Sequence, residues 1–393
     1  MTGVQTCALP ISPADAFIVQ KLKSEGAIIL GKTNLDEFTL GVSGRNIRFG
    51  QTLNPFDAKR TPGGSSAGSA VATAAGLCAA AIGSDASGSV RLPASACGIV
   101  GYKPSLGVIS RNGLTPFVPT KDTVGVMARS VLDIAELTQI ISGHDPGDTL
   151  TAQAPKWRFP DFSKKTLKGV KIGVLTSYFK EADPAVVEVV KRSKESLRKL
   201  GADLVELSVF DDREMQLAGN RINGWEFREN IFRAVKKIRP EIKESDLLKE
   251  MDPVVSLFFR KYSEISFDAY QGALKHTREK VTTMCKEYFS LVDILLYPSS
   301  PLLPFSVETS MDAARKGIEF LRDFYGKFRR NSELSGITGF PAISVPGGIS
   351  DSGLPVGIEF MAAPFQDPRL LEVAHLYQTS VHLKFRPAML ALE

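Results

Sequence analysis

Two glycine-flanked serine clusters are the residues of this chain best suited to carry out chemistry. The first is Gly63-Gly64-Ser65-Ser66, and the second is Ala86-Ser87-Gly88-Ser89. Glycines allow backbone conformations that other residues avoid, so a neighbouring serine hydroxyl can be held at a sharp turn facing a reacting group. Consecutive small residues can also aim several backbone N–H groups at one point, which suits a negatively charged oxygen. A serine beside such a point is arranged for acyl transfer.

The segment between the clusters predicts the elements that would bring Ser65 and Ser89 together. Residues 66–80 are uncharged and rich in small side chains, which is typical of a buried helix. Residues 79–83 predict a buried strand, and residues 90–97 predict a short helix. The first serine would then lie at the start of a helix and the second just after the strand that returns beside it. This layout favours a serine hydrolase.

A phosphate-binding loop and an α/β-hydrolase elbow are the two rival interpretations of these clusters. The chain has neither a Gly-Lys-Ser/Thr ending nor a G-x-G-x-x-G segment between a strand and a helix. The segment Gly64-Ser65-Ser66-Ala67-Gly68 does match the G-x-S-x-G elbow, with Ser66 as the nucleophile. That elbow requires a strand immediately before it, whereas residues 54–62 form a turn-rich polar loop. Ser66 is therefore not expected to be the nucleophile.

Motifs along most of the chain resemble the amidase signature family. The resemblance runs from about Phe17 to Phe365, apart from a divergent middle, and its ordered motifs occupy residues 31–38, 54–66, 88–104, 122–130, 293–298, 340–347 and 353–360. It implies an enzyme that hydrolyses C–N bonds of amides, and in some members esters or carbamates. Motifs in this order over such a length are a specific signal.

The resemblance implies a Ser-Ser-Lys catalytic triad. Ser89 matches the nucleophile, and Ser65 matches a bridging serine whose peptide bond to the preceding glycine is cis. The bridging hydroxyl would relay a proton to a buried, neutral lysine, whose pKa burial lowers. Ser87 stands where most relatives have a glycine, a change that would stiffen the oxyanion hole or add a hydroxyl donor. The implied oxyanion hole consists of the backbone N–H groups of Ala86, Ser87, Gly88 and Ser89.

The lysine of this triad has no counterpart in the sequence. In relatives it lies on a strand several dozen residues further upstream, in a Val-Lys-Asp-type motif. Lys32, which follows a run predicted to be buried at residues 27–31, is the best internal substitute. Residues 1–12 resemble no family segment and lack the features of a signal peptide. We therefore expect a truncated reading frame that carries a non-native leader.

Length and composition favour one large α/β enzyme. A chain of 393 residues with 43% hydrophobic residues can bury a substantial core. Strands alternate with helices, which predicts a three-layer α/β/α architecture with a large mixed sheet. We divide the chain into a leader (1–12), a first part of the amidase core with the serine motifs (13–150), a variable and largely helical middle segment that forms a lid or side wall (151–290), and the C-terminal part of the same core (291–393).

The charge pattern and the cysteines predict few partners beyond a small-molecule amide or carbamate substrate. The net charge is +5, and the lysine-rich stretches are interleaved with Asp and Glu, which favours solvated helix faces over a nucleic-acid groove. The four cysteines lack metal-binding spacing, and free thiols suit a reducing cytoplasm. We expect a cytoplasmic protein that uses no metal or cofactor, binds neither nucleic acid nor a membrane directly, and is compatible with a homodimer.

The substrate is less well defined by the sequence. In relatives, two loops line the acyl pocket, and they match Ser43 with Gly44 and Leu302 with Leu303. The two leucines predict a pocket that accepts apolar or aryl groups, so an aryl amide or a urethane is as plausible as an aliphatic amide. Trp225 is expected in the core rather than in the pocket.

Two other functions stay open. Residues 141–146 resemble the A-type subunit of an aminoacyl-tRNA amidotransferase, a glutaminase, although the region after residues 267–270 lacks the expected glutamine-binding pattern. The missing lysine leaves a catalytically impaired binding protein as the other alternative.

Overall fold

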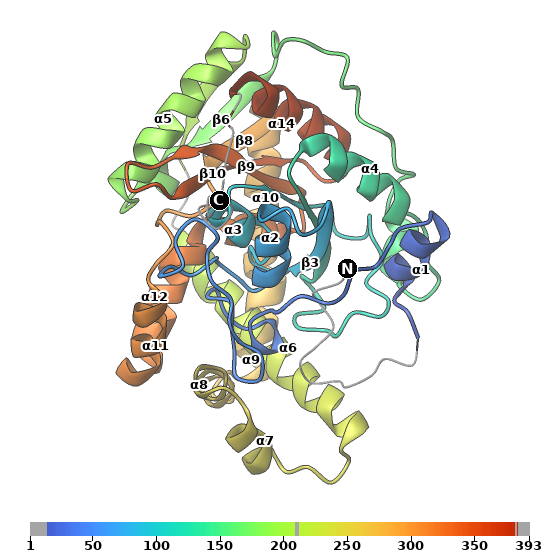
Figure 1. The fold of residues 1–393 in the computed structure, drawn as a ribbon, viewed down its shortest axis with the longest axis vertical. Helices are drawn as coiled ribbons and strands as arrows, with labels where there is room; N and C mark the ends of the chain where they lie inside the picture. The colour runs from blue at the N-terminus through green and yellow to red at the C-terminus, as the bar shows by residue number, and fades with distance from the viewer. Residues whose placement is uncertain (1–13, 209–211, 382, 384–393) are drawn as a thin grey trace.

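The computed structural model describes residues 14–208, 212–381 and 383 (Figure 1). The leader predicted at residues 1–12 lies outside them. The strands in the described residues are β1 (Arg45–Asn46), β2 (Gly50–Gln51), β3 (Ala80–Asp85), β4 (Val100–Lys103), β5 (Thr123–Ala128), β6 (Lys171–Leu175), β7 (Asp203–Leu207), β8 (Ile294–Pro298), β9 (Ala342–Ile349) and β10 (Pro355–Ala362).

The α-helices in the same residues are α1 (Phe17–Ser24), α2 (Ala67–Ala74), α3 (Arg91–Ala96), α4 (Val131–Ile141), α5 (Pro184–Lys199), α6 (Asp212–Ile238), α7 (Glu244–Glu250), α8 (Pro253–Tyr262), α9 (Phe267–Gly272), α10 (Arg278–Leu291), α11 (Val307–Lys316), α12 (Ile318–Arg329), α13 (Glu333–Thr338) and α14 (Asp367–Val381). Several have ordinary start signals. The side chain of Asp183 accepts a hydrogen bond from the N–H of Ala185, and Pro184 occupies the first turn of α5.

A mixed sheet forms the centre of the molecule. Among the described residues it has eight strands in the order β3-β5-β4-β9-β10-β8-β6-β7. Strand β6 pairs in parallel with β7 and β8, and the other pairs are antiparallel. This arrangement confirms the predicted α/β fold with a large mixed sheet.

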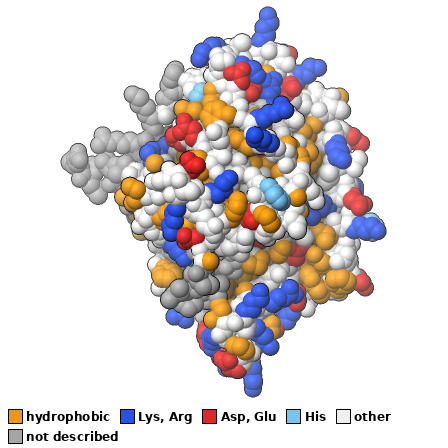
Figure 2. Space-filling view, turned by 90° about the vertical axis from the view of Figure 1, so that its right-hand side faces the viewer, with side chains coloured by type: hydrophobic (Ala, Val, Ile, Leu, Met, Phe, Trp, Pro, Cys, Tyr) orange, Lys and Arg blue, Asp and Glu red, His pale blue; other side chains and the backbone are white. Residues whose placement is uncertain are grey.

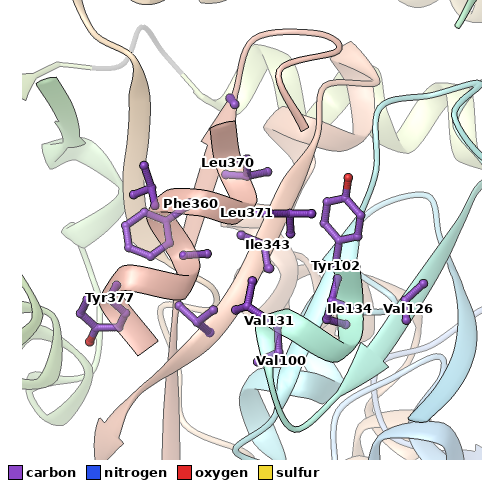
Figure 3. Packing of buried hydrophobic residues seen from close by; sticks show 14 of the residues in the cluster. Val100, Tyr102, Val126, Val131, Ile134, Ile343, Phe360, Leu370, Leu371 and Tyr377 are labelled. Atoms are coloured by element: carbon purple, nitrogen blue, oxygen red, sulfur yellow. The ribbon is translucent and has the colours of Figure 1, made fainter. Parts of the chain in front are cut away.

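Side chains alternate between the two faces of the sheet, and each face is covered by helices. In β8, Ile294 and Leu296 belong to one hydrophobic cluster, whereas Leu295 and Tyr297 belong to another. The first cluster lies under α4, α5 and α14, and Figure 3 shows side chains of β4, β5, β9 and β10 packed against α4 and α14. The opposite face is covered by α2 and α3 at one end and by α6, α10 and α13 at the other.

One prediction about burial is wrong. Residues 27–31 were expected to be buried, but Ile28 is 86% exposed and Leu30 is 65% exposed. Ile29 between them packs against the main core. The run Ala27-Ile28-Ile29-Leu30-Gly31 has no polar residue, and such a run is covered on both faces only where neighbouring elements lie on both sides. Here the segment forms no described strand, so one face stays in solvent.

Residues 151–290 are largely helical; α5 packs on the sheet, whereas α6, α7 and α8 extend below it in the view of Figure 1. Among the described helices, none has the length and apolar character needed to cross a membrane. On the face shown in Figure 2, lysine and arginine side chains are interspersed with Asp and Glu, as the sequence pattern indicates.

Candidate active site

The structure brings the two serine clusters together. Ser65 lies in the turn before α2, and Ser89 lies in the loop between β3 and α3. The backbone N–H of Ser66 donates a hydrogen bond of 3.1 Å to the carbonyl of Ser89. The peptide bond between Gly64 and Ser65 is cis, as the family resemblance implied. The two hydroxyl-bearing turns therefore form one site from segments that a helix and a strand separate.

Two glycines with positive φ make this close approach sterically feasible. Gly63 has φ +75°, and a Cβ atom there would lie 2.9 Å from the Cα of Pro93 in α3. Gly88 has φ +105°, and a Cβ atom there would lie 2.5 Å from the Oγ of Ser332. Side chains at these positions would both strain the backbone and collide with a neighbouring element. The glycines thus set the separation between each serine cluster and its surroundings.

Asp85, at the end of β3, fixes the loop that carries Ser89. Its carboxylate accepts hydrogen bonds from the N–H groups of Gly88 (2.7 Å) and Val90 (3.1 Å). Arg91 donates to the same carboxylate from Nε (3.0 Å) and Nη2 (2.9 Å), and also pairs with Glu359 of β10. Burial alone would raise the pKa of Asp85, but the Arg91 guanidinium holds that pKa below its usual range. The loop therefore rests on a buried, ionised carboxylate.

This anchoring changes the composition of the oxyanion hole expected from the sequence. The N–H of Gly88 already donates to Asp85, so it is engaged within the loop. In the described residues, the N–H groups of Ala86, Ser87 and Ser89 have no hydrogen-bond acceptor. These three N–H groups are the ones available to an oxyanion, with Gly88 as an anchor between them.

Ser89 opens into a cavity of about 60 Å³. Ser89 is partly exposed in this cavity, whereas Ser65 is 1% exposed and lies behind it. Helices α6 and α8 of the middle segment, together with α12, supply much of the wall. The lining residues are Thr39, Leu40, Gly41, Val42, Ser87, Ser89, Phe117, Asn220, Asn223, Phe258, Tyr262, Arg322, Tyr325, Gly326 and Arg329.

The structure places the four predicted substrate-binding residues away from this lining. Ser43 and Gly44 donate hydrogen bonds to the buried carboxylate of Asp36, and their neighbours in the same loop, residues 41–42, line the cavity instead. Leu302 and Leu303 line a separate, much smaller cavity of about 10 Å³. Their assignment as substrate contacts stays a prediction.

No lysine among the described residues lies within hydrogen-bonding distance of the Ser65 or Ser89 hydroxyl. Lys32, the internal substitute suggested by the sequence, is exposed. Neither serine hydroxyl has a hydrogen-bond partner in the described part of the chain. Groups of three or more His, Cys, Asp or Glu side chains that could hold a metal ion are also absent from it.

Sequence reasoning missed the polar wall of the cavity. Asn220 and Asn223 come from α6, and Arg322 and Arg329 come from α12, all more than 100 residues from Ser89. Their spacing within each helix is three and seven residues, which places each pair on one helix face. That periodicity could have indicated a shared face, but nothing in the sequence shows that this face meets the serine loop.

Comparisons with known proteins show what this chain is similar to. A profile of the family described as Amidase matches residues 1–371. The A-type subunit of glutamyl-tRNA(Gln) amidotransferase from Koribacter versatilis (strain Ellin345) is 34% identical over 380 residues, which cover 93% of this chain and 78% of that protein. The structure of 6-aminohexanoate cyclic dimer hydrolase complexed with substrate superposes with a TM-score of 0.85 at 28% identity, covering 96% of this chain and 80% of the other. Native peptide amidase from Stenotrophomonas maltophilia gives a TM-score of 0.82 at 29% identity, with 98% and 80% covered.

Proposed function

This chain belongs to the amidase family, and we propose that it hydrolyses carboxylic amides through an acyl-enzyme formed on Ser89. The observation that carries the proposal is the position of Ser89. Ser89 is partly exposed in a cavity, and Asp85 holds the backbone of its loop. The carbonyl of Ser89 accepts a hydrogen bond from the N–H of Ser66 in the first serine cluster. A nucleophile, free N–H donors and a relay hydroxyl are three of the parts that acyl transfer through a serine uses, and a base is the fourth.

The proposed reaction has two halves. The Oγ of Ser89 attacks the amide carbonyl carbon, and its proton passes to the Ser65 hydroxyl and onward to a base. The N–H groups of Ala86, Ser87 and Ser89 stabilise the oxyanion. The C–N bond then breaks, the leaving amine takes a proton, and an ester to Ser89 remains. Water attacks this ester and releases the carboxylic acid. Among the described residues no lysine lies within hydrogen-bonding distance of Ser65, so we assign the base to no residue in this part of the chain.

The lining supports an acyl group with an aromatic or apolar part. Phe117, Phe258, Tyr262 and Tyr325 supply aromatic rings to the cavity, and rings of this kind pack well against aryl groups. We therefore include aryl amides and carbamates (urethanes) among the proposed substrates.

A substrate panel tests the proposal. The purified chain is assayed with an aryl amide, an aliphatic amide, an aryl carbamate and glutamine, beside the Ser89→Ala variant. We expect turnover of at least one amide that is lost in Ser89→Ala. Full activity in Ser89→Ala would refute the assignment. Failure of the wild type to turn over any substrate and to react with a fluorophosphonate would favour the impaired binding protein.

A second candidate is the glutaminase component of an aminoacyl-tRNA amidotransferase. It is supported by relatives such as the Koribacter A-type subunit and its counterpart from Synechococcus sp. (strain RCC307), which is 35% identical over 387 residues. Glutamine hydrolysis that appears only when a B-type partner chain is added, together with co-purification of the two chains, would establish this candidate. Glutamine hydrolysis by the chain alone, unchanged by the added partner, would argue against it.

A further inference from the structure

A buried cluster of charged side chains lies behind the oxyanion loop and takes no part in the reaction proposed above. At its centre is Lys121, which is 1% exposed. Its Nζ donates to the Oγ of Ser87 (2.8 Å) and to the Oδ1 of Asn223 (3.0 Å), and it forms an ion pair with Glu333. Glu333 is itself 1% exposed and also pairs with Arg329 at 2.8 Å. Three segments that are distant in the sequence, represented by Lys121, Asn223 and Glu333, therefore converge on the hydroxyl of Ser87, two residues before Ser89.

In this cluster Lys121 acts as a hydrogen-bond donor to the side-chain oxygens of Ser87, Asn223 and Glu333. Burial lowers the pKa of Lys121, and the carboxylate of Glu333 opposes that change. Burial also opposes ionisation of Glu333, but Lys121 and Arg329 hold its pKa below the usual range. The nearby cations Arg329 and Arg278 lower the pKa of Lys121 further.

The Ser87 hydroxyl is held by this cluster. It accepts hydrogen bonds from Lys121 (2.8 Å) and from the Nδ2 of Asn223 (3.2 Å). It also interacts with Glu333 and contributes to the low pKa of that carboxyl. The neighbouring carboxylate competes with any substrate oxygen for the hydroxyl proton. Of the two roles open for Ser87 from the sequence, stiffening the loop fits this geometry and a direct hydroxyl donor does not.

We propose that Lys121 is a positioning residue that acts through Ser87. With Glu333 and Asn223 it holds the Ser87 side chain, and so fixes the backbone N–H groups that face the reacting carbonyl. Asp85 anchors the same loop from the other side through Gly88 and Val90. The inference rests on the proposed function, because the loop matters for catalysis only if Ser89 forms an acyl-enzyme.

The test is a double-mutant comparison of wild type, Lys121→Met, Ser87→Gly and the double variant. One readout is the second-order rate at which a fluorophosphonate labels Ser89, and the other is amide hydrogen exchange of residues 86–91 by mass spectrometry. Ser95→Ala is the matched control, because it removes a serine hydroxyl that is also 8% exposed, from a site in α3 outside the Ser89 cavity.

We expect Lys121→Met to slow labelling about 10- to 100-fold, in line with a misplaced oxyanion donor, and to speed exchange in residues 86–91 but not across the sheet. Ser87→Gly should have a similar effect. In the Ser87→Gly background, Lys121→Met should change labelling by less than about threefold, since both act through one contact. Ser95→Ala should label within about twofold of wild type.

Two results would overturn the proposal. One is an effect of Lys121→Met that is equally large in the Ser87→Gly background, because Lys121 would then act independently of Ser87. The other is faster exchange throughout the protein in Lys121→Met, which would indicate a general structural role. Absence of labelling in wild type would refute the proposed function instead. The exchange of residues 86–91 would then still decide whether Lys121 anchors this loop, and unchanged exchange in Lys121→Met would refute the inference.

Discussion

Neighbouring serines of the first cluster have different surroundings. The hydroxyl of Ser66 donates to the carbonyl of Ser84 and accepts from its N–H, both at 3.3 Å, so it ties the turn to β3. The hydroxyl of Ser65 has no such partner among the described residues. A relay hydroxyl must be free to exchange protons, whereas a structural hydroxyl is engaged. The hydrogen bonds therefore favour a structural role for Ser66 and a relay role for Ser65. In the sequence, the same distinction rested on the absence of a strand before Ser66.

Ser65→Ala should lower kcat by about 10²- to 10⁴-fold without unfolding the protein, because it removes a proton relay and little packing. Ser66→Ala should retain most activity and lose about 1 kcal/mol of unfolding free energy, the usual net value of a hydrogen bond. Steady-state kinetics and thermal unfolding of both variants make the comparison. An activity loss in Ser66→Ala that matches the loss in Ser65→Ala would contradict the distinction.

Both serines could be selected from the sequence because glycines lie next to them. The sequence also showed that Ser87 is unusual, but it did not show which side chains hold the Ser87 hydroxyl. Lys121 and Glu333 are 212 residues apart, and no local pattern predicts which buried charges pair across that distance.

At the scale of elements, one ion-pair network joins three parts of the site. Arg91 at the start of α3 pairs with Asp85 of β3 and with Glu359 of β10, and all three side chains are fully buried. Removing one member of such a network leaves buried charges without partners, which is far more costly than losing an exposed pair. The network therefore couples the stability of the sheet to the position of the Ser89 loop.

Arg91→Met should lower the unfolding free energy by about 3–5 kcal/mol, because Asp85 and Glu359 lose their shared cation. Urea denaturation measures the change. Arg239→Met is the control, since Arg239 forms an exposed pair with Glu250 and its loss should have little effect. Equal stability of the two variants would show that the buried network contributes no more than a surface pair.

The cavity wall contributed by α12 predicts a charge preference. Arg322 lines the cavity, with its side chain 48% exposed and paired with Glu319. Arg322→Met should reduce kcat/KM for an amide that carries a carboxylate about fivefold more than for a neutral analogue, since a partly screened charge pair contributes about 1 kcal/mol. Arg315→Met in α11, which removes a similar (i,i+3) pair outside the cavity, should not discriminate. Equal effects of Arg322→Met on both substrates would contradict this role.

Most elements that position the site follow from local patterns. The strand and the short helix around the serines were predicted from composition and turn residues, and β3 and α3 match them to within two residues, whereas the small-residue helix α2 ends at Ala74 and not near residue 80. The run at residues 27–31 was mispredicted, because hydrophobicity reports a tendency to be buried and not the presence of a partner. The cavity wall could not be predicted, because it depends on how α6, α8 and α12 pack against one another.

At the scale of the whole molecule, buried carboxyl groups make stability depend on pH. Asp122 accepts hydrogen bonds from the N–H groups of Phe117 and Val118 through one oxygen. Burial raises its pKa to about 6, with Glu226 contributing and Arg111 opposing. The folded state therefore retains a proton at pH values where the unfolded chain has lost it. This group's contribution to the unfolding free energy falls as the pH rises from about 4 to about 6.

Asp122→Asn should remove that part of the pH dependence. An amide oxygen can accept both backbone hydrogen bonds and carries no charge to desolvate. Relative to wild type, the variant should gain unfolding free energy between pH 4 and pH 7, by at most about 3 kcal/mol for a shift of about two pKa units. Denaturation curves across this range give the difference. A stability difference that does not vary with pH would contradict the raised pKa of Asp122.

The central claim, that Ser89 is an acyl-accepting nucleophile in this chain, is tested most directly by mass spectrometry after reaction with a fluorophosphonate. We expect one covalent adduct per chain, located by peptide mapping at Ser89 and absent from Ser89→Ala. An adduct at Ser65 or Ser66, or equal labelling of wild type and Ser89→Ala, would contradict it.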